Sequence, residues 1–204
     1  LRLAADTRDL DLMLIVGLPY AHRGTLYNCA AALYGGEILG LVPKTWLPNY
    51  AEFYERRYFT SGRRLEGCTV EIGTQTVPFG CDLLFCHRFM PELKVGVELC
   101  EDLWAPDPPS TALALAGATV ICNPSASDEL VTKDEYRRQL VSSHAARLVC
   151  GYVYCNAGDG ESTQDVVYTG QNLICENGVL LAESEAASGL TISELDVQRL
   201  DHER

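Results

Sequence analysis

The chain has 204 residues, a net charge of −12 and a hydrophobic content of 47%. These values fit a globular protein of one large domain or two small ones. The acidic excess argues against nucleic acid and anionic membranes as partners, because both bind clustered Lys and Arg. No apolar run approaches the roughly 20 residues of a membrane span, and the opening lacks a signal-peptide pattern.

Along the chain, the hydrophobic pattern predicts many short strands. We expect them at residues 12–18, 26–34, 37–42, 70–72, 75–79, 83–86, 94–99, 118–122, 150–156, 171–175, 179–183 and 190–195. The pairs Gly35-Gly36 and Asn177-Gly178 are turn signals, and each predicts a hairpin between the strands on either side. The segment 43–62, rich in aromatic and charged residues, is expected to be irregular.

Few helices interrupt these strands. A short helix is expected at 108–116, opened by prolines, and the longest at 132–148. Thr132 can cap this longest helix, with Glu135 as the capping-box partner. The charged tail 196–204 resembles the start of another helix. Strands with a few interposed helices predict a layered α/β fold built on sheets.

The nine cysteines are an odd number and include no Cys-x-x-Cys pair. The four histidines are isolated, so no zinc pattern forms and we expect no metal site. Scattered thiols in apolar contexts are typical of a reduced, cytoplasmic protein.

Cys100 differs from the other cysteines because it ends an apolar run and is followed by Glu101 and Asp102. This pattern predicts a strand that stops at a tight turn, where a cysteine can face a cleft on a rigid backbone. The alternative is a small buried hydrophobe, the commonest role of a free cysteine. Position alone leaves both interpretations open.

Two further segments carry candidate site residues. Lys44 follows a predicted strand and lies between two prolines, where it could stabilise an oxyanion or lower a thiol pKa. A solvated loop lysine is the alternative. The polar turn 123–127, with Ser125 and Ser127, follows the strand after Cys100. Ligand sites gather at the carboxyl ends of parallel strands, so one shared cleft is expected; turn formation and helix capping are the alternative role of these serines.

Together these segments resemble the carbon–nitrogen hydrolase (nitrilase) superfamily, which uses a Glu-Lys-Cys triad. The closest resemblance is to the glutaminase domain of glutamine-dependent NAD synthetases. The motifs that carry it are Lys44-Thr-Trp-Leu-Pro-Asn-Tyr50, Glu52-Phe-Tyr-Glu55, Gly96-Val-Glu-Leu-Cys-Glu-Asp-Leu-Trp104, Gly158-Asp-Gly-Glu-Ser-Thr163, Gly170-Gln-Asn and Glu176-Asn-Gly178. The likeness runs in order from about Leu12 to Glu183, nearly the whole chain.

The resemblance implies the fold and the catalytic roles. The fold would be a nitrilase-like α-β-β-α sandwich, with two central mixed sheets flanked by helices. Cys100 would be the nucleophile, and Lys44 and the backbone N–H of Glu101 would stabilise the oxyanion. Glu55 would be a supporting glutamate that orients the lysine.

The resemblance also implies a binding pocket for L-glutamine. Tyr50 and Phe53 would wall this pocket. Ser127 and Lys133 would hold the α-amino and α-carboxylate ends of glutamine. Position 133 often carries arginine in this branch, and lysine offers a point charge instead of a planar fork.

The general base of the family has no match here. It is a glutamate on a strand end upstream of the lysine, whereas Asp6, Asp9, Asp11 and Glu37 lie in other contexts. The chain also opens without Met, so we expect 1–204 to be a partial carbon–nitrogen hydrolase (glutamine amidotransferase) domain that lacks its amino-terminal part. A synthetase domain would need a Ser-Gly-Gly loop for pyrophosphate, and the sequence contains none.

The implied function is release of ammonia from glutamine through a cysteinyl thioester, for NAD synthesis. The glutaminase step would need no cofactor, whereas the missing synthetase domain would use ATP and Mg²⁺. The implied partners are that synthetase domain and further copies of the chain. A stand-alone amidase or nitrilase and a non-catalytic assembly module are the alternatives.

Overall fold

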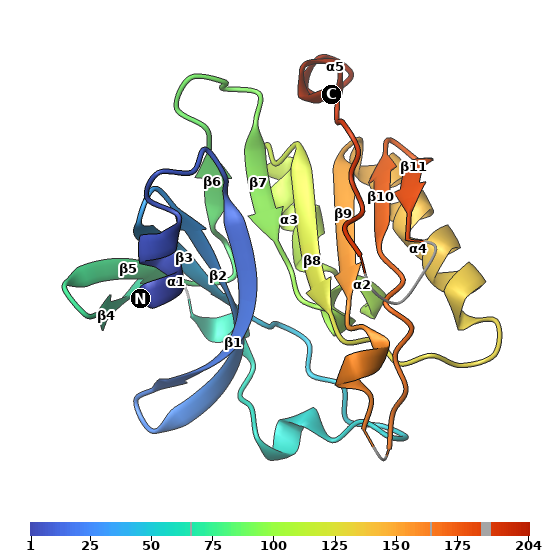
Figure 1. Ribbon diagram of the computed structural model, residues 1–204, viewed down its shortest axis with the longest axis horizontal. Coiled ribbons are helices and arrows are strands. Elements are labelled where there is room, and N and C mark those ends of the chain that lie inside the picture. The colour runs from blue at the N-terminus through green and yellow to red at the C-terminus, as the bar shows by residue number, and fades with distance from the viewer. Residues whose placement is uncertain (66, 164, 185–188) are drawn as a thin grey trace.

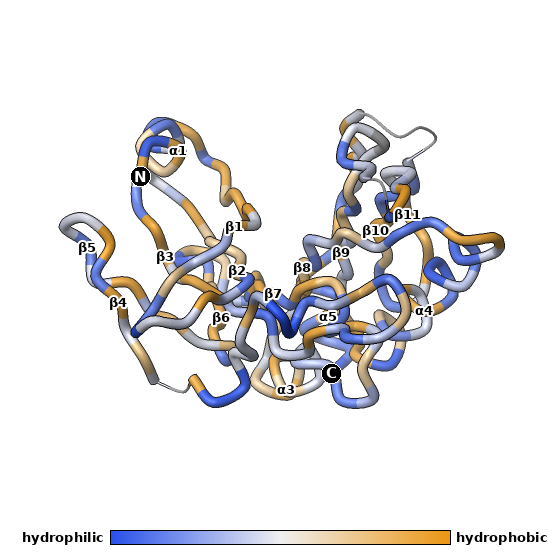
Figure 2. Tube along the Cα trace, turned by 90° about the horizontal axis from the view of Figure 1, so that it is seen from below, coloured by the Kyte–Doolittle hydropathy of each residue, from blue (hydrophilic) through white to orange (hydrophobic). Residues whose placement is uncertain are grey.

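The structure is a computed structural model that describes residues 1–65, 67–163, 165–184 and 189–204. Its strands form two mixed sheets that lie face to face in part (Figure 1). Seen from below, the first sheet lies at the left, and the second sheet extends from β6 and β7 near the middle to β10 and β11 at the right, with α4 beyond them (Figure 2). This layered α/β arrangement confirms the expected fold.

The first sheet has the strand order β1-β2-β3-β5-β4. Its members are β1 (Leu14–His22), β2 (Thr25–Tyr34), β3 (Glu37–Pro43), β4 (Cys68–Ile72) and β5 (Gln75–Phe79). The predicted hairpin joins β2 to β3. Its turn needs Gly35 and Gly36, whose φ angles of 59° and 90° are left-handed and strain other residues.

The second sheet has the order β11-β10-β9-β8-β7-β6. Its members are β6 (Leu84–Cys86), β7 (Lys94–Val97), β8 (Val120–Ser125), β9 (Gly151–Asn156), β10 (Leu173–Glu176) and β11 (Val179–Glu183). The three central strands, β7, β8 and β9, run parallel. Their carboxyl ends therefore meet at one edge of the sheet, which is where the polar turns after β7 and β8 lie.

The helices are α1 (Arg2–Asp6), α2 (Glu101–Trp104), α3 (Pro109–Leu115), α4 (Lys133–Leu148) and α5 (Val197–His202), with 3-10 turns at Glu55–Arg57, Gly62–Arg64 and Asp159–Glu161. Leu113 of α3 and Val141 and Ala145 of α4 pack against the outer face of the second sheet. In the described part of the chain, the first sheet has the short α1 against it, through Ala4.

A smaller core joins the two sheets. Ala30 and Val42 of the first sheet pack against Val97 and Leu99 of the second. This contact fixes the end of β3, and so Lys44, relative to the end of β7, and so Cys100. The packing of one sheet on the other thus decides the geometry of the site.

Two local expectations were wrong. Residues 190–195 form no strand; Leu190 and Ile192 are 85% and 73% exposed, and only a buried face would hold such a strand in register. Thr132 precedes α4, but its side chain makes no capping bond, and the residue is left-handed, with φ 70°.

Candidate active site

Cys100 lies on a strained elbow between β7 and α2. Its φ and ψ are 47° and −102°, a conformation that costs about 1–3 kcal/mol in a residue other than glycine. The Cys100 N–H donates to Oδ1 of Asn123, at 2.7 Å, from the end of β8. The elbow predicted from the sequence is therefore present. The bond to Asn123 holds its strained backbone in place, which keeps the position of a nucleophile rigid.

Lys44 follows β3 and is 3% exposed. Its Nζ lies 2.5 Å from Oε2 of Glu55, and the other carboxylate oxygen of Glu55 accepts from Nδ2 of Asn28 at 2.6 Å. Burial by itself lowers the pKa of Lys44, but the negative charges of Cys100 and Glu55 outweigh it and raise that pKa. The lysine is therefore a buried, fixed cation rather than a solvated loop residue.

One cavity of about 670 Å³ brings these groups together. Cys100, Lys44, Glu55 and Asn28 all line it, with Phe53 among the apolar residues of its wall. The remaining lining residues are Ile15, Gly17, Pro48, Leu99, Pro124, Ser125, Ala126, Cys155, Asn156, Ala157, Gly158, Glu161 and Tyr168. The shared cleft expected from the two polar turns exists, and Ser125 lines it.

Tyr50 and Glu101 are not among the residues that line this cavity, but each is next to one that does, Phe53 and Cys100. Tyr50 is 55% exposed, stacks edge-on against Phe53, and donates from its hydroxyl to the Glu101 carboxylate at 3.0 Å. The backbone N–H of Glu101 opens α2, and the first N–H groups of a helix have no partner within it. That N–H lies beside the Cys100 thiol and is suited to an oxyanion donor.

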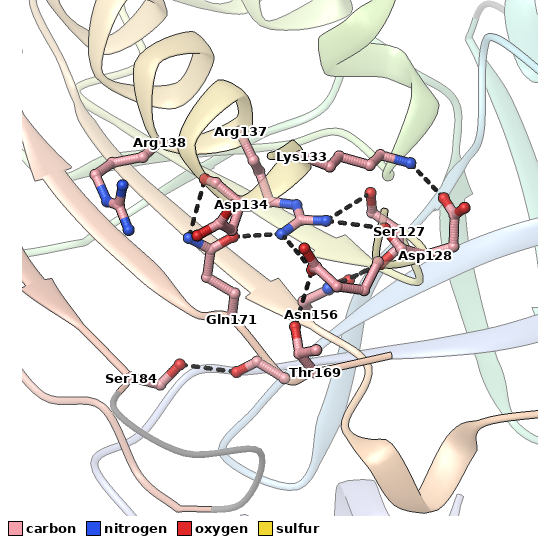
Figure 3. A network of polar contacts seen from close by, with 12 residues as sticks. Ser127, Asp128, Lys133, Asp134, Arg137, Arg138, Asn156, Thr169, Gln171 and Ser184 are labelled. Carbon is pink, nitrogen blue, oxygen red and sulfur yellow. Dashed lines mark hydrogen bonds and ion pairs between the residues drawn. The ribbon is translucent and has the colours of Figure 1, made fainter. Parts of the chain in front are cut away.

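Ser127 and Lys133 lie outside the lining of the cavity. Ser127 is buried, and its hydroxyl accepts from Arg137 at 3.3 Å. Lys133 forms an ion pair with Asp128 (Figure 3). Its Nζ also lies 5.9 Å from the ring centre of Phe53, which does line the cavity. Neither residue lines the cavity, although Lys133 lies close to Phe53, which does. A role of Ser127 and Lys133 in binding stays a prediction.

Sequence reasoning missed several polar residues that support the site. Asp102 and Glu98 flank the elbow and are 1% exposed each. In the sequence, Glu98 was included in the predicted strand 94–99 and Asp102 in the turn after it, and neither was assigned a role. Asn123 was seen only as part of a polar turn, and Asn28 not at all. The signal in the sequence that could have pointed to Glu98 and Asp102 was the presence of these acidic residues within the largely apolar run around Cys100.

Metal-binding clusters and membrane-spanning helices are both absent from the described residues. Within those residues, no group of three or more His, Cys, Asp or Glu side chains could hold a metal ion. In the same part of the chain, no helix is long and apolar enough to cross a membrane.

The fold and the Cys-Lys-Glu cavity define a class of enzyme, and the comparison with protein families agrees with it. Residues 1–203 match the carbon–nitrogen hydrolase family, so the chain belongs to that family. Two relatives of the chain share a more specific description within this family. The chain is 45% identical over its full length to the glutamine-dependent NAD(+) synthetase of Mycobacterium tuberculosis, and 33% identical over 88% of its length to that of Aquifex aeolicus.

Solved structures with the same fold include one such synthetase and one further protein of the nitrilase superfamily. The glutamine-dependent NAD(+) synthetase of Cytophaga hutchinsonii superposes on 92% of the chain with a TM-score of 0.79 and 31% identity. Saccharomyces cerevisiae Nit3, of the nitrilase superfamily, shares the fold with a TM-score of 0.73 at 20% identity. The chain spans 30% of the length of the Mycobacterium tuberculosis relative and 29% of the Cytophaga hutchinsonii chain.

Proposed function

We propose that the chain is the glutaminase part of a glutamine-dependent NAD synthetase. The observation that carries this proposal is the meeting of Cys100, on its strained elbow, with the buried Lys44–Glu55 pair in one cavity. Likeness to synthetases over the whole chain supports glutamine as the amide substrate.

In the proposed reaction, Cys100 Sγ attacks the side-chain amide carbon of glutamine. A carbon–sulfur bond forms, and the carbonyl electron pair moves onto the oxygen. Lys44 Nζ and the Glu101 N–H stabilise that oxyanion, because fixed donors in a dry site cost no reorganisation as charge develops. The pair then returns to re-form the carbonyl and the carbon–nitrogen bond breaks. The nitrogen leaves as ammonia after taking the proton that the general base removed from the Cys100 thiol. Water hydrolyses the thioester to glutamate and regenerates the thiol.

Glu55 has a supporting role in this scheme. Its two oxygens are already held by Lys44 and Asn28, so it orients the lysine rather than moving the proton. The general base would be a glutamate outside this chain. No cofactor is needed for these steps.

The remaining roles belong to the whole protein. A synthetase domain would use ATP and Mg²⁺ as a ligase, to amidate nicotinic acid adenine dinucleotide with the ammonia released here. We place the protein in the cytoplasm, which fits a chain whose nine cysteines are scattered through apolar contexts. We also propose that the intact protein forms a homo-oligomer, which light scattering would test.

The test compares amides as substrates of an intact protein that contains this chain. We expect ammonia release from glutamine at a kcat/KM at least ~10-fold above that for asparagine, butyramide or a simple nitrile, a difference of about 1.4 kcal/mol in transition-state binding. Preference for a simple amide would instead indicate a stand-alone amidase. Lack of activity on every compound, with Cys100 intact, would favour an assembly module.

A further inference from the structure

Asp102 occupies an unusual position between the two halves of the site. It is the second residue of α2 and is 1% exposed. Its carboxylate accepts hydrogen bonds from three backbone N–H groups: Trp46 at 2.6 Å, Leu99 at 3.0 Å and Thr45 at 3.1 Å. One side chain therefore holds both the loop that follows Lys44 and the residue that precedes Cys100.

The arrangement carries a large electrostatic cost. An ionised carboxylate loses several kcal/mol of hydration on burial, unless donors replace the water. Burial raises the pKa of Asp102 to about 7, while the N–H groups of Leu99 and Trp46 and the charge of Lys44 oppose that rise. A structure that only needed to join a loop to a helix could use an apolar contact instead.

The three bonds have a geometric consequence. Asp102 holds the backbone after Lys44, and the backbone N–H of Lys44 itself donates to Asn28 O at 2.7 Å. The lysine is therefore anchored on both sides of its Cα. The bond to Leu99 fixes the strand end from which the Cys100 elbow departs. The separation of the Lys44 ammonium and the Cys100 thiol is thus set through the Asp102 carboxylate.

We propose that Asp102 is a positioning residue that holds the Lys44 ammonium at the distance from Cys100 that the oxyanion and the thiolate require. This inference rests on the proposed function, in which Cys100 is the nucleophile. A displacement of about 1 Å in such a site can cost roughly 10²-fold in rate.

The variant that tests it is Asp102→Asn, which keeps the shape and removes one acceptor oxygen and the charge. The two possible effects of Asp102, positioning of Lys44 and direct charge repulsion, predict opposite changes in the apparent pKa of the Cys100 thiol. Removing a nearby negative charge by itself lowers a thiol pKa, because the thiolate is repelled less. Release of the Lys44 loop raises it, because the thiolate loses its cation.

The measurement is the rate of Cys100 alkylation by iodoacetamide against pH, read by mass spectrometry, which requires no turnover. We expect Asp102→Asn to raise the apparent pKa of Cys100 by about one unit. That rise should vanish in a Lys44→Met background, since Asp102 acts through Lys44. Asp107→Asn, a neighbouring and exposed change of the same charge, is the control and should leave the pKa unchanged.

A lowered or unchanged pKa in Asp102→Asn, or an equal rise without Lys44, would overturn the proposal. If this variant does not fold, hydrogen exchange of the wild-type protein decides. The amides of Thr45 and Trp46 should then be protected as strongly as that of Leu99, and fast exchange of the first two would remove the bond on which the inference depends. These readouts differ from those of the proposed function, which fails if the wild-type protein does not hydrolyse glutamine.

Discussion

At the scale of single residues, Cys100 differs from several other cysteines of the chain, because it is exposed to the cavity whereas burial raises the pKa of their thiols. Cys100 lines the cavity, whereas burial raises the pKa values of Cys29, Cys122 and Cys150 to about 12. Because the thiolate is the reactive form, those buried thiols are inert at neutral pH. Cys100 also has what a thiolate needs nearby, a fixed cation in Lys44.

We therefore expect Cys100 to be the cysteine selectively labelled by an electrophile that mimics glutamine. Peptide mass spectrometry after brief labelling measures this. Cys155 is the internal control, because it lines the same cavity and burial raises its pKa. Equal labelling of Cys155 or Cys68 would remove the special role of Cys100.

A second prediction concerns Lys44. We expect Lys44→Ala in an intact protein to lower kcat by roughly 10²–10³ with a smaller change in KM, because an oxyanion donor acts mainly in the transition state. Steady-state kinetics with glutamine measures both constants. Lys133→Ala is the matched comparison and should raise KM more than it lowers kcat. Normal kcat with raised KM in Lys44→Ala would make Lys44 a ground-state contact instead.

At the scale of elements, α4 is attached to the second sheet by a buried arginine (Figure 3). Arg137 is fully buried, donates to Gln171 and to Asp128 O, and lies 3.3 Å from a Glu129 carboxylate oxygen. It therefore connects the start of α4 with the loop after β8 and the segment before β10. This contact also holds Ser127, so the position of that residue depends on α4.

We expect Arg137→Ala to lower the free energy of unfolding by roughly 2–4 kcal/mol, since several buried acceptors would lose their donor. Urea denaturation followed by circular dichroism measures the loss. Arg138→Ala on the same helix is the control, because Arg138 pairs with Glu183 near the surface and should cost less than about 1 kcal/mol. Similar losses in the two variants would mean that Arg137 is not a tertiary anchor.

At the scale of the whole molecule, the described cavity offers few carboxylates for a general base. Its lining includes Glu55, which is held by Lys44 and Asn28, and Glu161. Glu37 is exposed at the start of β3, and Asp11 borders a different cavity. None of the upstream acids weighed from the sequence lines the cavity of Cys100.

We therefore expect this chain of 204 residues to release ammonia from glutamine at least roughly 10²-fold more slowly than an otherwise identical protein extended at its amino end, because general acid–base help contributes about that much. An ammonia assay on both proteins measures the difference. Light scattering should also detect association of the shorter chain, since β1 lies at the edge of its sheet and can pair with another strand. Comparable activity in both proteins would assign the base to a carboxylate of this chain, and comparison of Glu55→Gln with Glu161→Gln would then show which of the two cavity carboxylates acts.

Much of the fold and the core of the site could be predicted from local sequence. Alternating or continuous apolar runs set the strands, and the Gly35-Gly36 turn set a hairpin, because these signals act between residues close in the chain. Cys100 and Lys44 were candidates from their local context, whereas their catalytic roles and that of Glu55 were implied by the resemblance to the family. Residues 190–195 were misread because an apolar pattern indicates a strand only where one face of it is buried, and Leu190 and Ile192 are exposed.

The family resemblance, most of the strands and the reactive groups follow from the sequence alone. Tertiary structure decided which of those groups meet. Asp102 and Arg137 look like surface charges in sequence, and only packing buries them among backbone donors and acceptors from distant segments. The physical reason is that burial and hydrogen-bond partners are set by contacts between residues far apart in the chain, such as the 56 positions that separate Trp46 from Asp102.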